Sequence, residues 1–145
     1  MNPILGIDFG QVRIGLAISD ELRFLAHPLQ TILANRSPVK EIAQIVRDRK
    51  VERVVVGIPR HMSGEAGAAA NAALEFADKL RAQLPCPVAT WDERLTTAAA
   101  ERALRDAGRK IHKTRHLIDQ VAAQMILQSY LDREGGTVST TERET

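Results

Sequence analysis

The sequence predicts an α/β protein in which a mixed β-sheet carries helices on its faces. Residues 4–9 and 13–19 read as two strands joined by a short turn, which is the spacing of a hairpin. Residues 54–58 (Val-Val-Val-Gly-Ile) form a continuous apolar run, typical of a strand covered on both sides. After the hairpin, helical and strand patterns alternate along the chain. Hairpin strands followed by such alternation indicate a sheet with both antiparallel and parallel neighbours.

The remaining strands and the first helix follow from local patterns. Residues 24–33 supply a third strand, in which Pro28 indicates an edge position or a bulge. A helix is expected next, with Ser37 as its N-cap and Pro38 at its first helical position. Residues 87–91 are expected to form the fifth strand.

Three further helices complete the predicted order. Residues 68–84 are rich in alanine and place apolar side chains at helical spacing. Thr96 or Thr97 is expected to cap a helix that runs to about residue 107, where Gly108 ends it. A last helix is expected over residues 116–133.

The composition fits one soluble domain. The chain has 145 residues, of which 44% are hydrophobic and 26% charged, and its formal net charge is +2. No apolar run approaches the roughly 20 residues that cross a bilayer, and residues 1–3 lack the basic start of a signal peptide. We therefore expect a cytoplasmic protein without membrane contact. Residues 1–134 form the predicted domain, and the polar residues 135–145 a disordered tail.

Three carboxylates occupy unusual positions. Asp8 lies within an apolar strand, where a charge costs several kcal/mol unless it is paired or bound to a metal. Glu93 follows the fifth strand, at the kind of strand end where ligand sites collect, and Asp119 lies near the start of the last helix. Each has an ordinary explanation, as a turn acceptor or as an acid at a helix N-terminus. Together they suggest a site for Mg²⁺ or Mn²⁺, which prefer carboxylate oxygens.

A basic segment precedes the last helix. A run of this kind is often a solvated face, but it could also hold phosphates next to the acids. Arg13 and Arg94 lie close in sequence to Asp8 and Glu93, and either could contact a nucleic-acid backbone; for Arg94, a structural ion pair with Asp92 or Glu101 is equally reasonable. The candidate phosphate-binding residues are Arg13, Arg94, Arg109, Lys110, Lys113 and Arg115.

Four ordered motifs resemble those of the YqgF-type, Holliday-junction-resolvase-like family. Residues 6–20 (GIDFGQVRIGLAISD) are similar to its opening motif, and residues 56–59 (VGIP), followed by Gly64, to the loop after its fourth strand. Residues 92–97 (DERLTT) resemble its second acidic motif, and residues 118–123 (IDQVAA) its last helix. The resemblance extends from residue 4 to residue 131.

The resemblance implies a ribonuclease-H-like fold: three antiparallel strands followed by parallel strands, flanked by helices. It implies that Asp8, Glu93 and Asp119 meet at one metal site, and that the protein trims the 5′ end of precursor 16S ribosomal RNA. An older interpretation is cleavage of four-way DNA junctions. Two departures stand out. Residues 54–59 offer no acid, so Glu93 must replace the acid that resolvases carry after the fourth strand, and Ser63 stands where the family more often has Asn or Asp.

The expected mechanism uses two cations about 3.5–4 Å apart, which activate a water molecule and stabilise the leaving oxygen. Asp8 is expected to bridge both ions, with Glu93 and Asp119 each holding one side. The competing hypotheses are a junction resolvase, a nucleic-acid-binding module without activity, and an ATPase with the same core, for which 145 residues lack the second lobe. The sequence leaves open whether the protein is a monomer or a homodimer.

Overall fold

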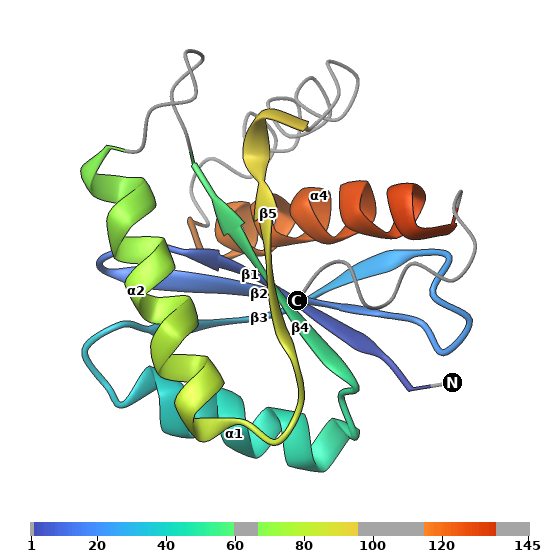
Figure 1. Cartoon of the computed structure of the whole chain (residues 1–145), viewed down its shortest axis with the longest axis horizontal. Coiled ribbons are helices and arrows are strands. Elements are labelled where there is room, and N and C mark those ends of the chain that lie inside the picture. The colour runs from blue at the N-terminus through green and yellow to red at the C-terminus, as the bar shows by residue number, and fades with distance from the viewer. Residues whose placement is uncertain (1, 60–66, 96–114, 136–145) are drawn as a thin grey trace.

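The computed structural model describes residues 2–59, 67–95 and 115–135. Within them, five strands form one sheet in the order β3-β2-β1-β4-β5 (Figure 1). Strands β1, β2 and β3 pair antiparallel, whereas β4 pairs parallel with β1 and with β5. The mixed sheet predicted from the sequence is therefore confirmed. The strands are β1 (Ile4–Phe9), β2 (Arg13–Ser19), β3 (Ala26–Leu33), β4 (Arg53–Ile58) and β5 (Val88–Asp92).

The helices cover both faces of the sheet. Helices α1 (Pro38–Arg49) and α2 (Ala68–Gln83) lie on one face, and α4 (Arg115–Gly135) crosses the other (Figure 1). Side chains alternate between the faces along each strand. In β1, Leu5 and Ile7 therefore pack under α1 and α2, whereas Ile4 packs against α4. The same alternation directs Asp8 toward the α4 face.

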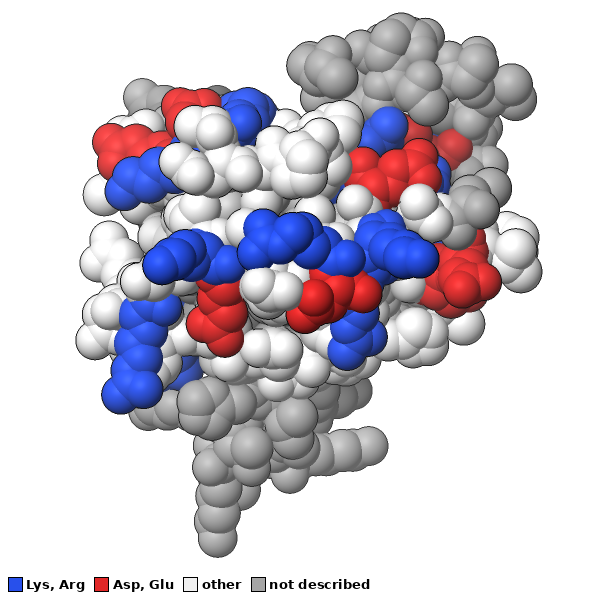
Figure 2. Space-filling view, turned by 90° about the horizontal axis from the view of Figure 1, so that it is seen from below, with Lys and Arg blue, Asp and Glu red and all other residues white. Residues whose placement is uncertain are grey.

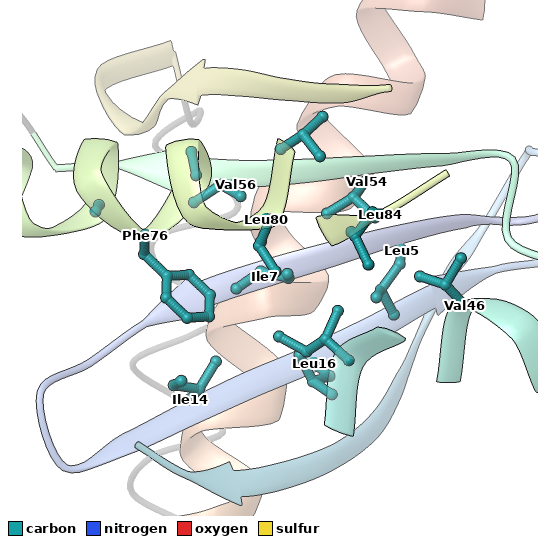
Figure 3. Close-up of a cluster of buried hydrophobic side chains, with 14 of the residues drawn as sticks. Leu5, Ile7, Ile14, Leu16, Val46, Val54, Val56, Phe76, Leu80 and Leu84 are labelled. Carbon is teal, nitrogen blue, oxygen red and sulfur yellow. The ribbon is translucent and has the colours of Figure 1, made fainter. Parts of the chain in front are cut away.

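Two apolar clusters result, one on each face. The larger one joins β1, β2 and β4 to α1 and α2, and Figure 3 shows its side chains interlocking between the sheet and the helices. The smaller one is formed mainly by α4, whose Ala123, Leu127 and Tyr130 are almost completely buried. The partly buried Trp91 packs edge-on against Tyr130, with the ring centroids 5.5 Å apart.

The start of α1 agrees with the sequence in position but not in its capping bond. Pro38 is the first helical residue and Ser37 precedes it. Ser37, however, adopts a left-handed conformation with φ 50°, and its side chain makes no capping hydrogen bond. The fixed φ of proline, rather than a serine cap, therefore defines this helix start.

Strand β3 begins two residues later than predicted. The Asp20 carboxylate accepts hydrogen bonds from the backbone N–H groups of Phe24 (2.8 Å) and Leu25 (3.4 Å), which holds these residues in the turn. Phe24 is consequently 69% exposed. As predicted for an edge position or a bulge, β3 is the edge strand, and Pro28 lies at an irregularity in its register with β2.

Three predicted segments lie outside the described residues: the loop with Ser63 and Gly64, the helix over residues 96–107 and the tail after Gly135. In the described part of the chain, no helix combines the length and apolar character needed to cross a membrane.

Candidate active site

Asp8 lies near the end of β1, the central strand of the sheet, between two glycines. Gly15 of β2 is its direct partner across the antiparallel pair. Gly57 of β4 follows Val56, which is the parallel partner of Ile7, so it lies on the other side of Asp8. Because neither neighbour has a side chain, they leave an opening beside the Asp8 carboxylate on the face toward α4, into which atoms of Asp119, Ile126 and Glu93 reach.

Glu93 brings a second carboxylate to this opening. It follows β5 directly, at the first position of the short 3₁₀ helix η1 (Glu93–Leu95). A Cβ atom on Gly57 would lie only 2.9 Å from Glu93 Oε2, so the Glu93 side chain occupies the space that the glycine leaves free. The charges of Glu93 and Asp8 consequently interact.

Asp119 reaches the same region from α4. A Cβ atom on Gly15 would collide with the backbone carbonyl oxygen of Asp119, so the helix lies directly on β2 at this point. The Arg13 side chain donates a hydrogen bond from Nε to Asp119 Oδ2 at 2.8 Å, and the exposed fractions of the two side chains are 27% and 21%. Arg13 therefore neutralises and orients Asp119.

The surroundings of Asp8 and Glu93 favour their protonated forms. Burial, and then the charge of Asp119, raises the pKa of Asp8 to about 6. Burial, followed by the charges of Asp8 and Asp92, raises the pKa of Glu93 to about 7. Partly desolvated carboxylates that repel one another form a donor set suited to a hard divalent cation, which would relieve both the burial cost and the repulsion.

The three predicted metal ligands are not grouped closely enough to hold one ion. Among residues 2–59, 67–95 and 115–135, no three His, Cys, Asp or Glu side chains are grouped closely enough to hold one ion. Asp8 interacts electrostatically with Glu93 on one side and with Asp119 on the other. The shared metal site thus stays a prediction, for which the central position of Asp8 is the supporting feature.

The sequence profile of the RuvX family, described as a Holliday junction resolvase, matches residues 2–133. The chain belongs to this family. A relative from Chloroflexus aggregans, named "Putative pre-16S rRNA nuclease", is 52% identical over 133 residues, which cover 90% of this chain and 94% of the relative. A relative of the same name from Nocardia farcinica is 45% identical over 143 residues, 92% of this chain and 79% of the relative.

Solved structures agree on the fold of this RuvX family member. RuvC from T. thermophilus, in complex with a Holliday junction substrate, superposes with a TM-score of 0.57 at 18% identity; the match covers 94% of this chain and 98% of RuvC. The fowlpox virus Holliday junction resolvase gives a TM-score of 0.55 at 13% identity, covering 90% and 99%. The ribonuclease-H-like architecture implied by the sequence motifs is therefore confirmed.

The structure of this RuvX protein describes only some of the predicted phosphate-binding residues, and two of these form ion pairs within the protein. Arg94 pairs with Asp92, donating from Nη2 to Oδ2 at 2.6 Å, so it has the structural ion pair that the sequence left open. Arg13 contacts Asp119 instead of standing free. Arg115 begins α4, but its side chain lies outside the described part, as do Arg109, Lys110 and Lys113 entirely. Phosphate binding by these residues stays a prediction.

Sequence reasoning missed two features of the RuvX site: the glycines beside Asp8 and the pairing of Arg13 with Asp119. The glycines did leave a signal, because glycine within a strand often marks a close approach by other groups. Gly15 and Gly57 both interrupt otherwise apolar strands. The ion pair joins residues 106 positions apart and left no comparable signal.

The raised pKa values predict that the metal-free protein loses stability as the pH rises. Between about pH 4 and pH 7, folded Asp8 and Glu93 keep protons that the unfolded chain releases, so the free energy of unfolding falls through this window. We expect these groups to account for a loss of about 2–4 kcal/mol. Urea unfolding in EDTA at pH 5 and pH 8 measures this loss of stability. The same measurement on a D8N/E93Q variant gives the pH dependence that comes from other groups, which is subtracted. Equal pH dependence in both proteins would contradict the coupling.

Proposed function

We propose that this protein is a metal-dependent nuclease that hydrolyses phosphodiester bonds and processes the 5′ end of precursor 16S ribosomal RNA in the cytoplasm. The observation that supports it most is the partly buried Asp8, which interacts with Glu93 and Asp119 in an opening of the sheet lined by two glycines. Membership of the RuvX family and the resolvase-like fold support a phosphodiester hydrolase.

Each acid has a distinct role in the proposed mechanism. Asp8 is central in the sheet and would contribute to both cation positions, while Glu93 and Asp119 would each complete one. Bound Mg²⁺ or Mn²⁺ supplies charge that polarises the phosphodiester and makes a water molecule more acidic. Arg13 holds the Asp119 carboxylate through Oδ2, so that this flexible side chain points in one direction before ions arrive.

Ribosomal RNA is the favoured substrate because the relatives that share about half of their residues with this chain are named for pre-16S rRNA. Branched DNA is the second candidate, supported by the family description and by the fold likeness to a RuvC bound to a Holliday junction. The RuvC likeness is at 18% identity, so it supports a shared architecture more than a shared substrate.

Incubation with two labelled substrates tests this proposal directly. A precursor 16S transcript with its 5′ leader and a four-way DNA junction are each treated with the purified protein in Mg²⁺, in Mn²⁺ and in EDTA. We expect shortening of the transcript at its 5′ end with either metal and none in EDTA, because the acids need cations to act. Cutting of the junction alone would favour the resolvase, and cleavage of RNA that persists in EDTA would overturn the metal mechanism.

A further inference from the structure

A groove of about 1010 Å³ runs between α1 and α2, on the face of the sheet opposite α4. Its rim carries Lys40 and Arg47 from α1 and Lys79 from α2, with Glu75 as the acid among its lining residues. Figure 2, seen from the α1 side, shows a row of Lys and Arg side chains with acidic side chains beside them. The groove therefore offers cations from two helices to anything that lies in it.

These cations are available for binding. In the described part of the chain, no salt bridge involves Lys40, Arg47 or Lys79. Arg47 donates only to the neutral Gln44 side chain, at 2.9 Å. Lysine and arginine side chains that already neutralise an acid have little left to offer a phosphate. The lack of an acid partner among the described residues therefore distinguishes these three from Arg13 and Arg94.

The groove lining includes residues that adjoin Asp8 in the sequence. They are Phe9, which follows Asp8 directly in β1, and Gln11 in the turn between β1 and β2. Phe9 stacks on Phe76 of α2 with the ring centroids 4.6 Å apart, so its position is fixed by packing. Since Asp8 faces α4 and Phe9 faces the groove, a strand bound in the groove needs to pass only the hairpin turn to reach the acids.

We propose that this groove binds a single-stranded stretch of the RNA substrate, with Lys40, Arg47 and Lys79 contacting its phosphates. The inference rests on the proposed function, because the groove would extend the hold on the RNA strand whose scissile bond lies at Asp8. A flexible polyanion fits a groove with cations along both sides, and such contacts give affinity without choice of sequence. The positive rim favours RNA over a second copy of this chain, which has the same positive net charge.

The test measures binding of a fluorescent 20-nucleotide single-stranded RNA by anisotropy, in EDTA and at several salt concentrations. A K40Q/K79Q variant should bind about 5–10-fold more weakly at 0.1 M salt. The plot of log binding constant against log salt concentration should also be less steep by about 1.4, because each of the two lost phosphate contacts contributes about 0.7 to its slope. The matched control is R49Q/K50Q, which removes the same charge from the end of α1 outside the groove lining. The control should keep nearly wild-type affinity.

The outcomes separate the groove from the proposed function. Suppose that wild type cleaves the precursor transcript, but K40Q/K79Q and R49Q/K50Q weaken RNA binding equally or leave it unchanged. The groove assignment is then overturned, while the proposed function stands. If wild type neither binds nor cleaves RNA, the proposed function fails and the groove with it. A change in self-association of K40Q/K79Q by sedimentation, with unchanged RNA affinity, would identify the groove as an interface between copies and overturn RNA binding.

Discussion

An Asp8→Asn variant should lose metal-dependent cleavage by about a thousand-fold or more, because the several kcal/mol that bound cations contribute to such reactions would be lost. The same change should stabilise the metal-free fold at pH 8 by about 1–3 kcal/mol, since it removes a carboxylate whose pKa is raised to about 6. Loss of activity combined with a gain of stability is the expected signature of an acid kept for function.

Thermal unfolding with and without Mn²⁺ at pH 8 completes this experiment. Wild type should melt at a higher temperature in Mn²⁺, because an ion that binds only the folded state stabilises it. D8N should melt higher than wild type in EDTA and respond little to the metal. Asp78→Asn is the matched control, since the Asp78 side chain is 75% exposed on α2, which covers the opposite face of the sheet from α4. Full residual activity of D8N, or a lower melting temperature in EDTA, would refute the assignment.

A Gly15→Ala variant should lower the free energy of unfolding by about 2–3 kcal/mol, because the added methyl group overpacks a tight contact. The new Cβ would meet the backbone carbonyl oxygen of Asp119 and lie 3.1 Å from its Cβ. Backbone atoms of a helix cannot rotate away as a side chain can, so α4 must shift as a whole. We expect cleavage to fall as well, since the shift moves Asp119 away from Asp8.

Gly57→Ala provides the comparison. Its new Cβ would lie 2.5 Å from Ile126 Cδ1 and 2.9 Å from Glu93 Oε2, both at the ends of side chains that can rotate. Urea unfolding should therefore show a smaller loss of stability than for Gly15→Ala, while activity still falls because Glu93 is displaced. Wild-type stability of Gly15→Ala, or a larger loss for Gly57→Ala, would be inconsistent with α4 lying on β2.

The fold was predictable from the sequence because its elements leave local signals. The apolar run of β4, the hairpin spacing of β1 and β2, and Pro38 at the start of α1 each specify an element without reference to the rest of the chain. The predicted start of β3 was two residues too early, because Phe24 is of a residue type that favours strands. An Asp20 turn and a hydrogen bond from Ala26 to Gln128 of α4 decide where this strand begins.

The candidate site was predictable only in part. Asp8 stood out as a charge within an apolar strand, and its raised pKa agrees with that physical reasoning. That Glu93 and Asp119 lie beside it came from the family resemblance, since no spacing rule connects residues so far apart. The partner of Arg13 could not be foreseen for the same reason, and Arg13 was expected to contact a nucleic-acid backbone instead of Asp119.

The docking of α4 sets the earliest stage of synthesis at which the proposed metal site can be complete. Gln128 and Gln124 of α4 bond to the backbone of Ala26 at 2.8 and 2.9 Å, and Asp119 meets Arg13, so each of these contacts spans roughly a hundred residues. Contacts of such long range close late in folding. A chain whose α4 has not yet been synthesised and docked therefore lacks Asp119, one of the three acids of the proposed metal site, and we expect it to be inactive.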